Sequence, residues 1–435
     1  MPKIAYYTLG CKVNQYETEK IREPLEKAGF VTVPFNSAAD IYIINTCSVT
    51  AVADSKSRAV VRKALDLNPE AHVIVTGCYA ELEPRAFRDI KKSQVVANAG
   101  KEDIVDLVVA KFGNSLETAA ENVDILPTSQ HTPPKTRPRI RTRAVVKVQD
   151  GCDQYCSYCI IPYARSLKYS RSLSEIVEEV SALADSGYKE IVLTGIRLGS
   201  YHEDTQTRPN TLPDLIGAVA GVPGIERIRL SSIEPWEVDC ELLEAMQLKA
   251  VCHHLHIPLQ SGDDDILTQM NRPYNSADYR KVIDQVQAKI PDVGITTDII
   301  VGFPGETERA FDNTCALVRE IGFSRLHVFR YSSRPGTLAA SLPNQISPAE
   351  KKSRSKALIE LGLATQRAFA ASLVGKSARV LVEKHSAGSN QLTGFTDNYV
   401  ETRFPGDPSL RGQIVTVRIV AIDQNYAIAK IEERR

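Results

Sequence analysis

The sequence has no excess of either charge, no apolar run long enough to cross a membrane, and no secretion signal at its start. Lys and Arg together number 53, as do Asp and Glu, so only a local patch could indicate a nucleic-acid partner. The chain begins Met1-Pro-Lys-Ile-Ala-Tyr-Tyr7, which predicts a strand rather than a signal peptide. These absences predict a cytoplasmic protein with no membrane partner. Its 435 residues suffice for roughly two to four domains.

A fourth cysteine is also missing where one would be expected. Cys152, Cys156 and Cys159 form a C-x3-C-x2-C pattern, and in a cytoplasmic protein such cysteines bind metal more often than they form disulfides. An ordinary [4Fe–4S] cluster and a closed zinc site both take four ligands. Three thiolates leave one position open, so we predict an iron–sulfur cluster whose fourth iron binds a substrate or cofactor. A zinc site completed by a distant histidine, or a disulfide with one spare thiol, are the alternatives.

Residues 3–112 alternate between strand-like and helix-like segments, which predicts an open, mostly parallel α/β sheet. The expected strands are Ile4–Leu9, Ile41–Asn45, His72–Thr76 and Gln94–Ala97. The expected helices are Gln15–Ala28, Val52–Leu65, Pro84–Ile90 and a last one after Lys101.

A cysteine follows each of the first three expected strands, namely Cys11, Cys47 and Cys78. The carboxyl ends of parallel strands share one edge of the sheet, where ligands bind. The three thiols should therefore meet in space. Buried structural cysteines are the alternative, but they would not explain why each falls at the same kind of junction. We predict a second three-cysteine cluster.

A linker is expected at residues 114–138, which are rich in Pro, Ser and Thr. From Ile125 to Gln149 the chain has no acidic residue. The basic residues of this stretch are Lys135, Arg137, Arg139, Arg141, Arg143 and Lys147. The four arginines alternate at period two and would share one face of an extended segment. The stretch is either a solvated linker or a phosphate-contacting strip.

Residues 139–368 repeat the strand–helix alternation, which predicts a partial (β/α)6 barrel that is open on one side. The expected strands are Ala144–Gln149, Glu190–Thr194, Arg227–Leu230, His253–Ile257, Gly294–Val301 and Arg325–Phe329. The expected helices are Leu173–Ser186, Leu212–Val219, Glu241–Met246, Ala277–Lys289, Glu308–Ile321 and Pro348–Thr365. The chemistry of β/α barrels lies at the carboxyl ends of the strands, and the C-x3-C-x2-C pattern follows the first strand. Cys240, Cys252 and Cys315 lie outside both triplets and are expected to be core or helix residues.

Residues 369–435 change to short strands separated by Gly, Asn and Pro, which predicts a small all-β barrel. The expected strands are Ala378–Glu383, Gln391–Phe395, Tyr399–Thr402, Ile414–Ile422 and Ala427–Glu432. Phe395 and Tyr399 could offer RNA a base-stacking surface. Packing in the core is the alternative.

The cluster motif at the first βα loop of a partial barrel resembles the radical S-adenosylmethionine (SAM) superfamily. The whole chain is similar to the methylthiotransferases, in which a three-cysteine N-terminal domain (here 1–113) precedes a radical SAM core (139–368) and a small β-barrel called TRAM (369–435). The segments that carry this resemblance are Thr8–Glu17, Asn45–Cys47, Thr76–Cys78, Gly151–Arg165, His256–Gly262, Asp298–Glu306 and Gly394–Val400.

The resemblance implies two [4Fe–4S] clusters. Cys152, Cys156 and Cys159 would hold the cluster that cleaves SAM to a 5′-deoxyadenosyl radical, while Cys11, Cys47 and Cys78 would hold an auxiliary cluster that carries the sulfur. One SAM would supply the methyl group and another the radical. Carbon 2 of an adenine has no acidic proton, so a radical route replaces the acid/base pair. An electron-donor protein is implied, and no side chain is assigned a catalytic role.

The branches of this family differ in their targets. Leu9-Gly-Cys-Lys-Val-Asn-Gln-Tyr16 is similar to the MtaB-like branch, which acts on N6-threonylcarbamoyladenosine in tRNA. The other branches read Cys-Gln-Met-Asn there (isopentenyladenosine in tRNA) or Cys-Pro-Lys-Asn (a ribosomal-protein aspartate). We expect methylthiolation of threonylcarbamoyladenosine at position 37 of tRNA, beside the anticodon. The targets of the other branches, or a non-catalytic iron–sulfur protein that binds RNA or senses redox state, are the alternatives.

Further site residues are expected from the resemblance and from strand ends. Tyr158 matches the aromatic residue that usually lies against the adenine of SAM. The candidate SAM contacts, for whose glycines turn geometry is the alternative, are Gly195, Ser232, Gln260, Gly302 and Glu306. Arg165 and Arg272 are the candidates for substrate or carboxylate contacts. The sequence departs from the usual family residues at Ser166, Tyr169, Arg197 and Arg330, which are expected to line the barrel mouth.

Overall fold

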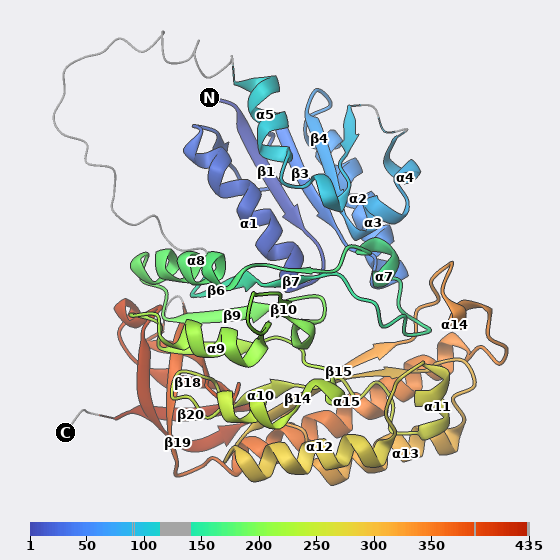
Figure 1. Cartoon of the computed structure of the whole chain (residues 1–435), viewed down its shortest axis with the longest axis vertical. Coiled ribbons are helices and arrows are strands. Elements are labelled where there is room, and N and C mark those ends of the chain that lie inside the picture. The colour runs from blue at the N-terminus through green and yellow to red at the C-terminus, as the bar shows by residue number, and fades with distance from the viewer. Residues whose placement is uncertain (89, 91, 114–140, 387–388, 433–435) are drawn as a thin grey trace.

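In the computed structural model the chain folds into three bodies that contact one another. Figure 1 shows the N-terminal α/β body at the top, the partial barrel across the middle and the closed β-barrel at the lower left. The structure describes residues 1–88, 90, 92–113, 141–386 and 389–432, so the expected linker lies outside them. Within these ranges, no helix has both the length and the apolar character to span a bilayer.

The N-terminal body is a five-stranded parallel sheet with helices on both faces. Its strand order is β2-β1-β3-β4-β5, with bounds Val31–Thr32, Lys3–Thr8, Ile41–Thr46, His72–Gly77 and Ser93–Val95. Its helices are α1 (Lys12–Lys27), α2 (Ala51–Leu67), α3 (Cys78–Leu82), α4 (Arg85–Arg88), the 3-10 turn η1 (Asn98–Gly100) and α5 (Ile104–Phe112). The open parallel sheet was predicted, β2 was missed, and the helix expected over Pro84–Ile90 is only α4.

Alternation along the strands explains why both faces of this sheet are covered. Ile4 and Ile43 face α1 and α5, whereas Ala5 and Ile44 face α2, α3 and α4. A strand buried on both faces reads as a continuous apolar run, as in the fully buried segment Ile41–Thr46. Because the strands themselves are apolar, the polar residues at the carboxyl edge of this sheet lie where the strands end.

The middle body is a curved sheet of six parallel strands in sequence order, open on one side as predicted. The strands are β6 (Arg143–Lys147), β9 (Glu190–Thr194), β12 (Arg227–Leu230), β13 (His254–His256), β14 (Gly294–Val301) and β15 (Arg325–Arg330). They form two three-stranded sheets, which the parallel bridges Ile228–Val251 and Ser232–His256 join. The short strands β7 (Gln149–Asp150) and β8 (Tyr169–Ser170), and β10 (His202–Glu203) and β11 (Asn210–Thr211), pair antiparallel beside them.

Helices cover the outside of this sheet. The helices of this body are α7 (Ile161–Ala164), α8 (Leu173–Asp185), α9 (Leu212–Ala220), α10 (Cys240–Ala245), α11 (Asp264–Gln269), α12 (Ser276–Lys289), α13 (Glu308–Ile321), α14 (Leu338–Ser341) and α15 (Pro348–Ala371), with 3-10 turns η2 (Leu198–Ser200) and η3 (Pro235–Glu237). Of these, α7 lies against α3 of the N-terminal body (Figure 1). The helix ends follow ordinary capping rules. Thr307 caps α13 through its side chain, and Gly322 ends that helix in the left-handed conformation.

The inside of the partial barrel is polar. In β13, Leu255 packs outward into the core, whereas His254 and His256 face inward. In the next strand, Thr296 and Asp298 also face inward, and His256 contacts both: Nε2 lies 3.2 Å from an oxygen of Asp298 and Nδ1 lies 2.9 Å from the Thr296 hydroxyl. The interior therefore offers hydrogen-bonding groups rather than an apolar lining.

The C-terminal body is a closed barrel of five strands, as predicted. Its strands are β16 (Ser377–His385), β17 (Gln391–Thr396), β18 (Glu401–Pro405), β19 (Ile414–Asp423) and β20 (Tyr426–Ile431), with the 3-10 turn η4 (Pro408–Leu410) between β18 and β19. Closure leaves no unpaired strand edge. The last helix of the middle body, α15, continues directly into it (Figure 1).

Candidate functional site

The first cysteine triplet lies at the carboxyl edge of the N-terminal sheet, as predicted. Cys11 follows β1, Cys47 follows β3, and Cys78 begins α3 directly after β4. Gly10 adopts the left-handed conformation (φ 96°), and a Cβ on it would lie 2.9 Å from the Cys47 sulfur. Burial raises the pKa of the Cys47 thiol to about 11, and the neighbouring Cys78 and Cys11 add to this.

The second triplet lies in the loop after β7. The Cys159 amide donates to the Cys156 carbonyl (2.9 Å), and the Gln154 amide lies 3.5 Å from the Cys152 sulfur. Burial, followed by Cys156, raises the pKa of the Cys159 thiol to about 12. Cys156 and Cys159 also line a surface pocket of about 400 Å³. This loop follows the first barrel strand, at the end where β/α barrels carry their chemistry.

Each triplet offers three thiols, which fit a [4Fe–4S] cluster that has one iron open. In such a cluster each thiolate binds a different iron, so its ligands surround a volume instead of meeting at a point. A buried arginine donates a hydrogen bond to one sulfur of each triplet: Arg165 to Cys78 and Arg272 to Cys156.

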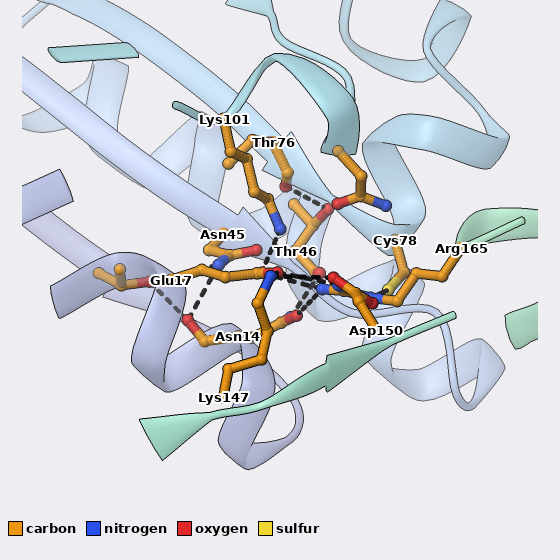
Figure 2. Close-up of polar contacts among 12 residues, drawn as sticks. Asn14, Glu17, Asn45, Thr46, Thr76, Cys78, Lys101, Lys147, Asp150 and Arg165 are labelled. Carbon is orange, nitrogen blue, oxygen red and sulfur yellow. Dashed lines mark hydrogen bonds and ion pairs between the residues drawn. The ribbon is translucent and has the colours of Figure 1, made fainter. Parts of the chain in front are cut away.

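Arg165 connects the first triplet to the middle body (Figure 2). It follows α7 of the middle body and is only 4% exposed. Its Nε lies 3.4 Å from the Cys78 sulfur, and its Nη atoms donate to Asp150 (2.9 Å) and to both oxygens of Glu17 (2.8 and 2.9 Å). Nη2 also donates to the Asn14 amide oxygen at 2.9 Å. Arg165 was expected to contact substrate or a carboxylate, and in the structure its donors contact the carboxylates of Glu17 and Asp150. A role in binding substrate stays a prediction.

Two lysines complete this buried charge network. Lys101 pairs with Glu17, and Lys147 lies 3.3 Å from Glu17 and 2.9 Å from Asp150. Burial alone would raise the pKa of Glu17, but Lys101, Arg165 and Lys147 together lower it far below its ordinary value. Glu17 and Lys101 come from the N-terminal body, whereas the other members come from the middle one. The network is therefore a buried, fully paired contact between the two bodies.

Arg272 has the matching position beside the second triplet. Its Nη1 donates to the Cys156 sulfur at 3.2 Å, and its guanidinium pairs with Glu234 and lies over the Trp236 ring at 4.9 Å. Nε donates to the Tyr274 hydroxyl at 3.2 Å. Of the contacts expected for Arg272, the one with a carboxylate is made by Glu234. A contact with substrate stays a prediction.

Tyr158 and three other candidate SAM contacts lie along the expected edge. Tyr158 packs against a small apolar cluster next to the cysteine loop, and burial raises its pKa. Gly195, Ser232 and Gln260 follow β9, β12 and β13 at their carboxyl ends. A Cβ on Gly195 would lie 2.8 Å from the side-chain oxygen of Gln149, so close packing alone requires a glycine there. The role of these residues in binding SAM stays a prediction.

Gly302 and Glu306 form a structural turn instead. Gly302 has φ 72°, and its amide donates to the Glu306 carboxylate. Glu306 is buried and also accepts from Arg354 of α15 at 2.9 Å. This carboxylate links the last helix to the barrel, and the expected contact of Glu306 with SAM stays a prediction.

Phe395 and Tyr399 are partly buried and also line a surface pocket. Their rings stack on each other at 4.8 Å, and the Tyr399 ring lies 4.7 Å from the His254 ring of the barrel in a tilted arrangement. Arg143 and Arg229 lie over the Tyr399 ring at 5.5 and 4.7 Å. These aromatics fill the contact between the closed barrel and the amino-terminal end of the partial barrel. These contacts agree with the packing alternative, and a role of the two rings in RNA stacking stays a prediction.

The basic residues expected to form a strip before the cluster loop have different surroundings where the structure describes them. Lys135, Arg137 and Arg139 lie outside the described residues. The side chain of Arg141 is exposed and donates to Gln15. Arg143 pairs with Glu383 at 2.7 Å, and Lys147 belongs to the buried network. The last two are structural cations and have no free charge for phosphate.

The departures from the usual family residues divide into two groups. Ser166 and Arg330 are exposed. Arg197 pairs with Glu237 (2.5 Å) and Asp153 (3.0 Å), and the Tyr169 hydroxyl accepts from Lys147 at 3.0 Å. Arg197 and Tyr169 therefore support the cluster loop. Of the three remaining cysteines, Cys252 and Cys315 are buried as expected, and Cys240 is exposed at the start of α10.

Sequence reasoning missed the acids and amides of the site. Asn14, Glu17 and Asp150 lie inside or beside the matching motifs, but nothing in a linear pattern shows that they meet. Arg334 was also missed: it reaches from the end of the partial barrel to Asp54 and Ser48 of the N-terminal body. The signal that could have found Glu17 is its position on the buried face of an otherwise amphipathic helix.

Comparison with known proteins agrees with this architecture along the whole chain. Residues 3–98 match "Uncharacterized protein family UPF0004", residues 146–318 the "Radical SAM superfamily" and residues 371–431 the "TRAM domain". The chain is 36% identical to "Threonylcarbamoyladenosine tRNA methylthiotransferase MtaB" of Bacillus subtilis, covering 98% of this chain and 95% of that one. It is 37% identical to the protein of the same name from Thermotoga maritima, covering 99% of this chain and 97% of that one.

Two further similarities concern a relative named for a different substrate and a solved structure of low sequence identity. A "tRNA-2-methylthio-N(6)-dimethylallyladenosine synthase" of Thermoanaerobacter is also 37% identical, over 96% of this chain and 90% of that one. Among solved structures, the radical S-adenosylmethionine methyltransferase TsrM from Kitasatospora setae, with cobalamin and a [4Fe–4S] cluster bound, aligns with a TM-score of 0.55. Its identity is 15%, over 78% of this chain and 77% of that one, so it shows the fold alone.

Proposed function

Because this chain belongs to the radical SAM methylthiotransferases, we propose that it methylthiolates carbon 2 of N6-threonylcarbamoyladenosine at position 37 of tRNA. Two [4Fe–4S] clusters and SAM are the cofactors of this proposal. Cys152, Cys156 and Cys159 would hold the SAM-cleaving cluster, and the N-terminal triplet would hold the auxiliary one. When bound, these groups supply the radical, the sulfur and the methyl group. The protein supplies placement and excludes water.

The observation that carries the choice of substrate is the position of Lys12. This residue directly follows Cys11 and begins α1, which runs beside β6 (Figure 1). Its positive charge contributes to lowering the pKa of His254 and His327, after burial and other neighbours, and that of Tyr399. His254 and His327 lie on two strands of the partial barrel, and Tyr399 of the C-terminal body packs against His254. The ammonium group of Lys12 therefore lies near the barrel interior.

Lys12 differs from the other cations of this interior in having no counter-charge. Arg143, Arg227 and Arg229 all share Glu190. Lys12 is exposed, and no described residue is recorded as its hydrogen-bond or ion-pair partner. A threonylcarbamoyl group carries a free carboxylate, which would complement such a cation, whereas an isopentenyl group is apolar.

The second candidate substrate is the isopentenylated adenosine of tRNA. The relative named a dimethylallyladenosine synthase is as similar to this chain as one of the threonylcarbamoyladenosine enzymes. The charge at position 12 favours the first candidate, because an apolar substituent would leave the ammonium without a partner.

Nucleoside mass spectrometry of tRNA from a deletion strain tests this choice. We expect 2-methylthio-N6-threonylcarbamoyladenosine to disappear, its unmodified precursor to accumulate, and the parent gene to restore the product. Loss of the methylthio-isopentenyl nucleoside instead would assign the chain to the other tRNA branch. No change in either nucleoside would refute tRNA as the target.

A further inference from the structure

A cysteine of the auxiliary triplet receives a hydrogen bond from a different body of the protein. Arg165 belongs to the middle body, yet its Nε lies 3.4 Å from the sulfur of Cys78. The two residues are both buried and 87 positions apart. Figure 2 shows the guanidinium between Cys78, Asn14 and the two acids, so its orientation is fixed from several sides.

We propose that Arg165 is a positioning residue that raises the reduction potential of the auxiliary cluster, and that it does so only when the N-terminal and middle bodies are docked. The proposal rests on the auxiliary cluster of the proposed function. It adds that the electronic properties of that cluster are set partly by the neighbouring body.

The physical basis is the charge that a ligand sulfur experiences. One-electron reduction makes a cluster more negative, and hydrogen bonds to its sulfurs and nearby positive charge favour the reduced form. Two carboxylates, Glu17 and Asp150, and three cations, Arg165, Lys101 and Lys147, make up the buried network. Its net charge is therefore one positive. Arg165 is the member whose donor reaches a sulfur.

The two acids of the network, Glu17 and Asp150, fix the direction in which the Nε–H group of Arg165 points. Glu17 and Asp150 accept from the Nη atoms, which leaves Nε directed at Cys78. A planar guanidinium held at one edge by two acids has little rotational freedom. Lysine could carry the charge at this place but could not make the same set of contacts.

A second arginine at the same boundary provides a matched control. Arg334 also reaches from the middle body, where it pairs with Asp54 and donates to Ser48 at 2.8 Å. It is similarly buried. Its partners among the described residues include no sulfur, although Ser48 directly follows Cys47, so we expect it to affect the cluster less than Arg165 does.

The test is a potentiometric titration of the auxiliary cluster alone. The full chain carrying Cys152→Ala, Cys156→Ala and Cys159→Ala is reconstituted anaerobically and titrated with dithionite, and the reduced cluster is followed by electron paramagnetic resonance. Arg165→Gln, Arg165→Lys and Arg334→Gln are compared in this background. We expect a lower midpoint potential for both Arg165 variants, a smaller shift for lysine than for glutamine, and a smaller shift for Arg334→Gln than for Arg165→Gln.

Arg165→Lys keeps the charge that the acids need, so it serves as the test if the neutral variant does not fold. An unchanged potential in Arg165→Lys would overturn the inference. Equal shifts in the Arg165 and Arg334 variants would also overturn it, because docking alone would then explain them. A background protein that assembles no cluster on Cys11, Cys47 and Cys78 would refute the auxiliary site of the proposed function itself.

Discussion

Ser48 accepts a hydrogen bond of 2.8 Å from Arg334, across 286 positions of the chain. Ser48 directly follows Cys47 and also donates to Asp54 at 3.0 Å, and Arg334 pairs with that acid. The loop of one auxiliary cysteine is therefore held by the far end of the partial barrel. Cys78 is held from the opposite side by Arg165. The site is shaped by two bodies, not one.

Replacing Arg334 should loosen this boundary. Arg334→Gln leaves Asp54 largely buried without its cation, which costs about 3 kcal/mol of unfolding free energy. Urea unfolding measures this difference. Lys27→Gln is the control, because its pair with Glu23 is exposed and contributes about 0.5 kcal/mol or less. Equal stability of the two variants would contradict the prediction.

The contact between the partial barrel and the C-terminal body should depend on pH through Glu190. Burial alone would raise the pKa of this carboxylate, but Arg229, Arg227 and Arg143 lower it below its ordinary value. Its stabilising contribution is therefore complete above the unfolded-state pKa of about 4.3 and is lost as pH falls through the folded-state value.

Glu190→Gln should accordingly cost about 3 kcal/mol at neutral pH. The difference in unfolding free energy between this variant and the parent should shrink below about pH 4, because the parent's carboxylate becomes protonated there. Urea unfolding across this range follows both proteins. Glu360→Gln, on the exposed face of α15, is the control and should track the parent. A difference in unfolding free energy that stays constant across this pH range would show that the charge of Glu190 does not contribute to stability.

Replacement by alanine should change the stability of the protein in opposite directions at two glycines, Gly77 and Gly217. Gly77 precedes Cys78 with φ 98°, and a Cβ there would overlap the Thr46 carbonyl. Gly77→Ala should therefore lose several kcal/mol of stability, on the order of 3, and lose iron at the N-terminal triplet. Gly217→Ala meets nothing within 4 Å inside α9 and should gain about 0.5–1 kcal/mol. Thermal unfolding and iron content report both.

Iron and sulfide analysis tests the assignment of the cysteines. After anaerobic reconstitution we expect two [4Fe–4S] clusters per chain. Changing Cys11, Cys47 and Cys78 to Ala should leave one, and changing all six should leave none. Cys240→Ala, at an exposed position outside both triplets, should keep two. Two clusters in the first triple variant would show that the N-terminal triplet holds none.

Lys12 should decide which modified adenosine is accepted. Lys12→Gln should lower kcat/KM for tRNA carrying threonylcarbamoyladenosine roughly tenfold or more, because a charge-assisted hydrogen bond to the carboxylate is lost. Lys12→Arg keeps the charge and should retain most of the activity. A substrate whose threonine is a methyl ester lacks this charge, so it should be used equally by the parent and Lys12→Gln. A parent that makes no distinction between acid and ester would refute this role.

The fold could be predicted closely because its signals are local. Thr307 and Gly322 mark the two ends of α13, and the predicted helix Glu308–Ile321 has the same bounds in the structure. The convergence of Cys11, Cys47 and Cys78 followed from topology, since parallel strands end at one edge. The two-residue strand β2 was missed because it has too few residues to show any periodicity.

The side-chain roles could not be predicted in the same way. Arg165 and Arg272 lie in motifs beside the cysteines, which suggested contacts with ligands. Their actual partners, Glu17 and Glu234, lie 148 and 38 positions away. Burial and pairing arise only when the bodies meet, so the sequence could not distinguish a donor for substrate from a donor for the protein itself.

The two triplets also differ in how a cluster could be delivered to them. Cys156 and Cys159 line a pocket on the outer surface. Cys47 and Cys78 are 6% and 4% exposed beneath the boundary between the bodies, whereas Cys11 is exposed. A cluster loaded onto this triplet after folding would therefore meet Cys11 before the two buried thiols. The unequal burial of the three cysteines would favour loading of such a cluster before the bodies close.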